Sequence, residues 1–164
     1  MLLHRHAEVA GQRYVVFVDG SRRYTDCTDG VCELLGYSRD EVLQKKIDEI
    51  SYQPNVTGLF AEYLRTGTQE GDYILQHKDR TPVPVRYRAF QFSDGCKAAI
   101  FEPLEDWRRQ YYAALLETDR SRLPTKIAAA LQAMEREDRS DVTKQRTMDN
   151  AAVRLRALAR GSGA

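Results

Sequence analysis

The sequence predicts an α+β protein: a five-stranded antiparallel sheet with helices on one face, followed by an all-α tail. Short β-branched and aromatic runs between Gly and Asp turns indicate the strands. Between the second and third of these strands, apolar residues recur at the spacing of a helix. From Leu104 onward the chain is rich in Ala, Leu, Arg and Glu, with no Gly before Gly161. We therefore expect an N-terminal segment (1–12), a folded domain (13–104) and a helical extension (105–164).

The folded domain opens with a hairpin and two short helices. Residues 13–18 and 22–27 are strand-like runs joined by an Asp-Gly turn. Gly36 can end the first helix in the left-handed conformation. Ser38 and Glu41 stand three residues apart before an apolar pair, which predicts a capping box at the start of the second helix.

A longer helix and three strands complete the predicted domain. In the stretch 56–64, apolar residues recur at steps of three and four, which indicates one buried helix face. The strands are expected at 72–77, 83–92 and 96–101, separated by polar turns. Residues alternate along the middle strand, so one of its faces is apolar and the other carries two arginines.

This order of elements, and two segments within it, resemble the PAS domain family. The segment 33–43 (Glu-Leu-Leu-Gly-Tyr-Ser-Arg-Asp-Glu-Val-Leu) is similar to the family's Leu-Leu-Gly-Tyr-Ser-x-x-Glu-Leu motif. The segment 77–85 is similar to the charged-Asp-Gly turn that precedes an apolar strand in these domains. The resemblance covers about residues 13 to 104 and implies a PAS fold with a sensory or signalling role.

The resemblance does not extend to the flavin-binding or haem-binding members. Flavin-binding LOV domains carry a reactive Cys in an Asn-Cys-Arg-Phe-Leu segment, but residues 50–63 contain no Cys. Haem-binding members use an axial His on the long helix, and residues 55–66 contain no His. The sequence supports neither cofactor and leaves any other cofactor unknown.

A PAS sheet that curls around its helices can enclose a cavity for a small ligand. Tyr87 is the residue whose hydroxyl could hydrogen-bond a bound molecule. The alternative, that the apolar side chains simply fill the space, stays open. The residues that we expect to face the cavity are Phe17, Val31, Leu35, Phe60, Leu64, Val85, Tyr87 and Ile100.

The sequence offers no recognisable catalytic or metal site. It contains no Ser, His and carboxylate pattern, phosphate-binding loop or metal-ligand helix, so we predict that the protein is not an enzyme. His4 and His6 could hold a metal in principle but belong to the N-terminal segment, and no metal is predicted. Cys27 and Cys32 lack zinc-site spacing and are interpreted as small buried hydrophobes rather than a redox pair.

The tail contains three amphipathic helical stretches, of which the first has the widest apolar stripe. Its stripe consists of Trp107, Tyr111 and Leu115, and the later helices follow Pro124 and Ser140. These apolar faces can pack on the sheet, on each other or on a second chain. Because PAS domains resemble one another in dimerising through flanking helices, we expect a homodimer through Trp107, Tyr111 and Leu115.

Composition argues against membrane and nucleic-acid partners. Lys and Arg total 25 against 24 Asp and Glu, so the net charge of +1 provides no chain-wide attraction to polyanions. No apolar run approaches the ~18 to 20 residues that span a bilayer. Charged residues near the start of the chain leave no room for the apolar segment of a secretory signal. Residues 142–164 have a net charge of +4, but a solvated helix face is the favoured interpretation.

The chain has three cysteines, an odd number, which favours a reducing, cytoplasmic setting.

The resulting functional prediction is a non-enzymatic, bacterial-type sensory PAS module. It would bind a small molecule or a protein partner and associate through its flanking helices. A ligand-free dimerisation or assembly protein is the alternative, and a metabolite found bound after purification would favour the first.

Overall fold

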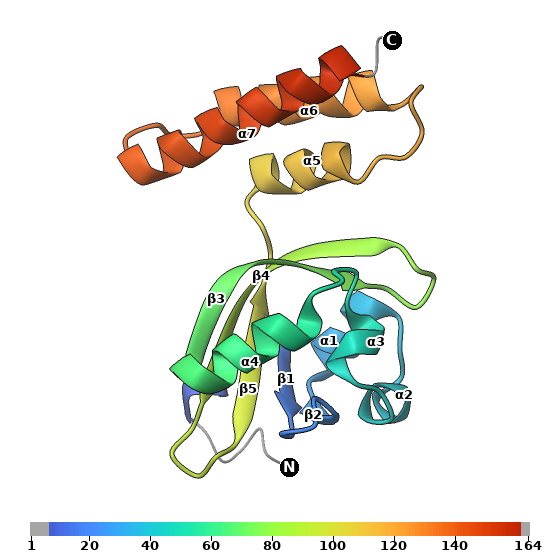
Figure 1. Cartoon of the computed structure of the whole chain (residues 1–164), viewed down its shortest axis with the longest axis vertical. Helices are drawn as coiled ribbons and strands as arrows, with labels where there is room; N and C mark the ends of the chain where they lie inside the picture. Colours follow the sequence, from blue (N-terminus) through green and yellow to red (C-terminus); the bar gives the residue numbers. More distant parts are fainter. Residues whose placement is uncertain (1–6, 162–164) are drawn as a thin grey trace. The chain divides into compact units, whose positions relative to one another are not determined.

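The computed structural model describes residues 7–161, which form two compact units. The chain divides after Pro103, so that the sheet and its helices form the first unit and the C-terminal helices form the second (Figure 1). Each unit has its own hydrophobic core.

The first unit is built on one five-stranded sheet, in the order β2-β1-β5-β4-β3. Every neighbouring pair of strands is antiparallel, which confirms the predicted sheet. β3 begins at residue 68, earlier than the predicted start at 72, and pairs with β4 along its whole length. The strands are β1 (Val15–Val18), β2 (Tyr24–Cys27), β3 (Thr68–Gln76), β4 (Pro82–Gln91) and β5 (Lys97–Glu102).

Four helices separate β2 from β3 and pack on one face of the sheet. The first three of them share a core cluster with strand residues such as Val16, Leu75 and Phe101. The helices are α1 (Asp29–Leu35), α2 (Arg39–Leu43), α3 (Ile47–Ile50) and α4 (Val56–Thr66), and a 3-10 turn, η2 (Ala7–Val9), precedes β1. The single turn α3 was not predicted, because four residues carry too little periodicity to be recognised.

The predicted capping box of α2 and the glycine that ends α1 are confirmed, whereas the side chain of Thr28, the N-cap of α1, makes no capping hydrogen bond. The Glu41 amide donates to Ser38 Oγ at 3.2 Å, and the Ser38 amide donates to Glu41 Oε2 at 2.9 Å, which closes the capping box. Gly36 ends α1 with φ of 74°, and its amide donates to the Cys32 carbonyl at 2.9 Å. These local interactions set the path of the chain from β2 into α2.

Replacing Gly36 by alanine is expected to destabilise the first unit more than the same change at Gly67. Both glycines end a helix at positive φ, 74° and 76°, and an L-residue pays about 1 to 2 kcal/mol there. A Cβ at Gly36 also falls 2.5 Å from His77 Nε2, whereas one at Gly67 meets nothing within 4 Å. The partly exposed His77 ring must move to admit the methyl group, so Gly36→Ala should lose about 1 kcal/mol more than Gly67→Ala in chemical denaturation. Equal losses would contradict the His77 contact.

The sheet buries apolar side chains on both of its faces. On the face away from the helices, a second cluster contains Val9, Val15, Phe17, Ala98 and Ile100. Val9 comes from η2, so the segment before β1 covers this part of the sheet. The sheet is therefore a central layer rather than the outer wall of a single core.

The two arginines predicted on one face of β4 form ion pairs with carboxylates of its neighbours. Arg88 Nη2 lies 2.7 Å from Glu102 Oε1 of β5. Arg86 lies 3.7 Å from carboxylate oxygens of both Glu70 and Asp72 of β3. These pairs balance the charge on that face locally.

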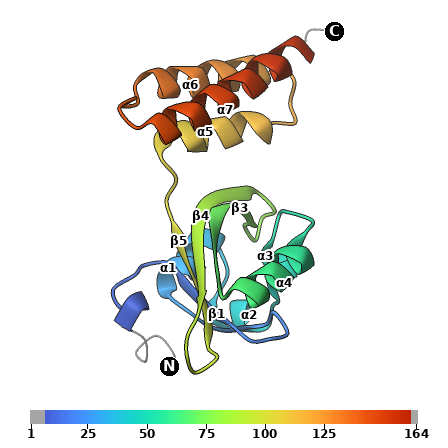
Figure 2. The same cartoon turned by 60° about the vertical axis from the view of Figure 1, so that its left-hand side comes forward.

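The second unit consists of three helices that pack on one another (Figure 2). They are α5 (Asp106–Leu115), α6 (Leu123–Glu135) and α7 (Val142–Gly161). Pro124 lies in the first turn of α6, where its missing N–H costs no hydrogen bond. In the part of the chain that the structure describes, no helix is both long and apolar enough to cross a membrane.

Lys144 of α7 joins the beginning of α5 to the end of α6. Its Nζ lies 2.8 Å from Glu105 Oε1 and 2.7 Å from Glu137 Oε2. Hydrogen bonds to these two carboxylates raise the pKa of Lys144 above its usual range. The ammonium therefore stays charged and links all three helices.

Candidate functional site

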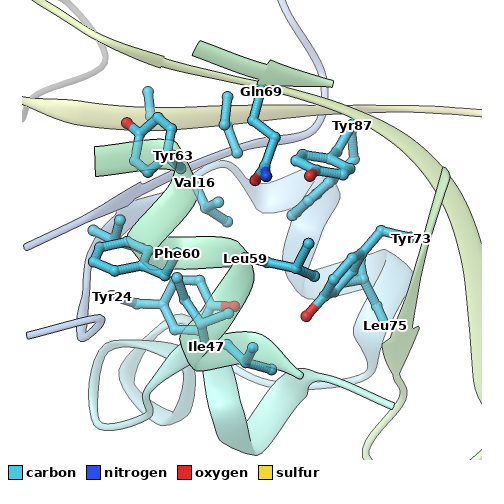
Figure 3. A pocket seen from close by; sticks show the side chains of 16 residues that line it. Val16, Tyr24, Ile47, Leu59, Phe60, Tyr63, Gln69, Tyr73, Leu75 and Tyr87 are labelled. Atoms are coloured by element: carbon cyan, nitrogen blue, oxygen red, sulfur yellow. The ribbon is translucent and has the colours of Figure 1, made fainter. Parts of the chain in front are cut away.

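An apolar cavity of about 90 Å³ lies between α4 and the sheet of the first unit (Figure 3). The helix side supplies residues of α4, and the sheet side supplies residues of all five strands. The lining residues are Val16, Val18, Tyr24, Ile47, Val56, Leu59, Phe60, Tyr63, Gln69, Tyr73, Leu75, Tyr87, Ala89, Ala98, Ala99 and Phe101.

The space follows from helix periodicity on one side and small side chains on the other. Val56, Phe60 and Tyr63 recur at helical spacing, so α4 presents them together. Ala89 of β4 and Ala99 of β5 are paired in register on the central strands. Because two methyl groups stand where larger side chains would reach the helix, part of the space stays unfilled.

Three polar side chains end in this apolar space. Figure 3 shows the ends of Tyr24, Gln69 and Tyr87 turned towards the middle of the cavity. Within residues 7–161, none of the three side chains makes a hydrogen bond. Tyr24 is only 4% exposed, so its hydroxyl has little access to bulk water.

The other two tyrosines of the cavity are held by protein groups. The Tyr63 hydroxyl donates to the Phe90 carbonyl at 2.7 Å, and the Tyr73 hydroxyl is hydrogen-bonded to Ser51 Oγ. These bonds fix the rings as walls of the cavity. The polar groups that remain for a bound molecule are those of Tyr24, Gln69 and Tyr87.

The cavity carries no formal charge at neutral pH. Burial raises the pKa of Tyr63 to about 12 and also raises the pKa of Tyr24, Tyr73 and Tyr87. All four phenols are therefore protonated, and no Asp, Glu, Lys, Arg or His lines the space. Such a site suits a neutral molecule, because an ion would lose its hydration without gaining a countercharge.

Two of the predicted cavity residues, Phe60 and Tyr87, line the cavity. Val31, Leu35 and Val85 belong to the core cluster on the same side of the sheet but do not reach the space. They pack among the shorter helices and the strands. Their placement corresponds to the alternative in which apolar side chains simply fill the interior.

The prediction that Phe17, Ile100 and Leu64 face the cavity is wrong. Phe17 and Ile100 lie in the cluster on the opposite face of the sheet, because Val16 takes the inner position and neighbouring strand residues point to opposite faces. All four residues of β1 are apolar, so the sequence does not reveal which alternate set faces inward. Leu64 is 43% exposed, at the edge of the apolar stripe of α4.

Sequence reasoning missed the two unpredicted polar groups of the cavity. Tyr24 stands in the predicted second strand, where its position opposite α4 is visible only in the folded unit. Gln69 lies in the first residues of β3, which the pattern left outside the strand. The first five residues of β3 are all polar or Gly, so no sequence signal singles out Gln69.

The predicted dimerisation residues lie in the second unit, and two of them are buried within a single chain. Trp107 and Tyr111 pack in the core of α5, α6 and α7, with Trp107 only 1% exposed. Leu115 is 39% exposed. The three helices bury one another's apolar faces, so the burial of Trp107 does not require a second chain. A homodimer stays a prediction.

The histidines and cysteines considered as possible metal or redox residues form no metal site among the described residues. His4 and His6 lie outside the described residues. Among residues 7–161, no group of three or more His, Cys, Asp or Glu side chains is arranged to hold a metal ion. Cys27 is buried in the core cluster of the first unit, as predicted, and Cys32 is partly buried beside it.

Several solved structures have the same fold at low sequence identity. A PAS domain from Desulfitobacterium hafniense is 20% identical, with a TM-score of 0.52 over 58% of this chain and 95% of that chain. The PAS domain of an HTR-like protein from Haloarcula marismortui is 15% identical, with a TM-score of 0.51 over 58% and 84% of the two chains. The PAS domain of the fruit-fly ELK potassium channel is 16% identical, with a TM-score of 0.51 over 63% and 97%.

The family model described as PAS domain matches residues 12–106, more than half of the chain. No curated protein sequence matches the chain significantly. The sheet order, the helices between β2 and β3, and the solved structures agree with the family match. The chain therefore belongs to the PAS domain family.

Proposed function

We propose that this chain is a non-enzymatic sensory module whose PAS unit binds a small neutral molecule in the cavity beneath α4. The observation that carries the proposal is the group of three polar side chains, Tyr24, Gln69 and Tyr87, that end in an apolar cavity without a hydrogen bond in the described chain. Polar groups that border an apolar space can hydrogen-bond a molecule that enters it. A ligand with one hydrogen-bonding group and an apolar body would supply that partner.

The dimensions of the cavity limit the ligand to a few heavy atoms. A cavity of about 150 Å³ accommodates benzene, and a water molecule takes about 30 Å³ of liquid volume. The cavity of about 90 Å³ lies between these values. A short alcohol or ketone fits this size, the neutral lining and the available hydrogen-bonding groups.

The position of the cavity supports a signalling role. Ala99 and Phe101 of β5 line it, and β5 ends at Glu102, immediately before the boundary between the two units. A molecule bound against β5 would change the packing beneath the strand that leads into the helical unit. The proposed output is a change in that unit.

We expect 2-propanol to bind the full chain more tightly than 2-chloropropane, which has a similar shape but cannot donate a hydrogen bond. Tyr24→Phe and Tyr87→Phe keep the rings and remove one hydroxyl each. A hydrogen bond contributes about 1 kcal/mol, so each variant should weaken 2-propanol binding by about fivefold and leave 2-chloropropane binding unchanged. Chemical-shift titration of the cavity residues would measure both affinities.

Tyr37→Phe is the matched control, because Tyr37 belongs to the same unit but does not line the cavity. It should leave both affinities unchanged. Equal affinity of the wild-type protein for the two probes, or shifts that spread outside the cavity, would contradict the proposal. Native mass spectrometry of the purified chain would show in addition whether a ligand is retained.

A further inference from the structure

The first unit contains two cysteines in direct contact. Cys27 is the last residue of β2, and Cys32 lies in α1, so the turn between them reverses the chain and brings the two side chains together. Their Sγ atoms are 3.8 Å apart. A disulfide requires about 2.0 Å between sulfurs, a difference that small side-chain rotations can supply.

The two thiols differ in access to solvent. Cys27 is buried in the core, whereas Cys32 is partly exposed at the surface of α1. A reagent from solution can therefore reach Cys32 first. The third cysteine, Cys96, is also partly exposed, but it immediately precedes β5 and packs against the cluster on the other face of the sheet.

A guanidinium lies beside the pair. Arg39 Nη1 donates to the Cys27 carbonyl at 2.5 Å, and Arg39 also pairs with Asp26. The thiolate is the nucleophile in thiol chemistry, and Cys32 is the thiol of the pair that solvent reaches. Cys32 thus combines access to solvent with a neighbouring thiol.

We propose that Cys27 and Cys32 form a dithiol site that low-molecular-weight disulfides oxidise to an intramolecular disulfide. The Cys32 thiolate attacks one sulfur of glutathione disulfide, forms a mixed disulfide and releases one glutathione thiolate, which takes up a proton. Cys27 then loses its proton and attacks the Cys32 sulfur, releasing the second glutathione. The two cysteines lose two protons and two electrons in total, and glutathione disulfide gains them to become two thiols.

The second step is the slow one. Burial raises the pKa of the Cys27 thiol to about 12, so only a small fraction of it is thiolate near neutral pH. The mixed disulfide on Cys32 should therefore appear before the protein disulfide. Raising the pH towards 9 should speed its conversion, because the thiolate fraction of Cys27 increases about tenfold for each pH unit.

The experiment treats the full chain with glutathione disulfide under native conditions, stops the reaction by alkylation in denaturant and measures intact mass. The wild-type protein should lose two hydrogens, and its three alkylated cysteines should fall to one. Cys96→Ser is the matched control and should still form the disulfide. Peptide mapping should place the bond between residues 27 and 32.

Two single variants separate the steps. In the Cys96→Ser background, Cys27→Ser should stop at the mixed disulfide on Cys32, and Cys32→Ser should form neither an adduct nor a protein disulfide. Circular dichroism would verify that both variants are folded, and Cys27→Ala replaces Cys27→Ser if the buried hydroxyl unfolds the unit. The proposal is overturned if the wild-type protein keeps a glutathione adduct, remains fully reduced or forms only disulfides between chains.

Discussion

Replacing Trp107 by alanine should unfold the helical unit and leave the PAS unit folded. Trp107 is the largest fully buried side chain of the protein's described part, and truncating a buried Trp costs about 3 to 5 kcal/mol. At 0.05 to 0.15 kcal/mol per residue, a unit of roughly 60 residues has about 3 to 9 kcal/mol of stability. The loss is comparable to that total. The helical signal in circular dichroism should fall while the amide shifts of the PAS unit persist.

Leu115→Ala is the control within the same helix. Leu115 is 39% exposed, so its truncation should cost about 1 kcal/mol or less. Sedimentation velocity distinguishes this expectation from the dimer predicted from the sequence. A folded Trp107→Ala protein that changes from dimer to monomer would show that Trp107 acts between chains rather than inside one.

Replacing Arg39 by methionine should destabilise the PAS unit by about 2 to 3 kcal/mol. Arg39 of α2 pairs with Asp26 of β2, whose side chain is 3% exposed. Removing one partner of a buried ion pair leaves a buried charge, which costs about 3 to 5 kcal/mol. The Arg39 side chain is 35% exposed, so water offsets part of this cost. Urea denaturation followed by the PAS-unit signals would measure it.

The variant Asp26→Asn/Arg39→Met tests whether the buried charge causes the loss. The amide oxygen of Asn can still accept from the Cys27 amide, which donates to Asp26 at 2.8 Å, but carries no charge. The double variant should recover most of the stability lost in Arg39→Met. Additive losses in the double variant would refute this explanation.

The parts of the fold that short segments encode were predictable. The capping box of Ser38 and Glu41 and the left-handed Gly36 depend on residues at most four positions apart. The same is true of the alternation that separates Arg86 and Arg88 from Val85 and Tyr87. Because these patterns involve only residues close together in the sequence, they can be recognised without knowing the tertiary fold.

The candidate site was only half predictable, because it depends on contacts between distant segments. Phe60 and Tyr87 were identified, but Phe17 and Ile100 were placed on the wrong face. The sheet is buried on both faces, so the usual alternation of apolar and polar residues is missing on β1 and much of β5. Without that alternation, the register alone decides which residues face the helices.

The sequence by itself determined the order of the elements, their caps and turns and the PAS resemblance, because each depends on neighbouring residues. Only the tertiary structure decided where Tyr24 and Gln69 meet, that Cys27 contacts Cys32, and that Trp107 finds its partners in α6 and α7. Amphipathic periodicity shows that a face must be buried but not which surface covers it. That choice depends on how segments far apart in the chain fit together in three dimensions.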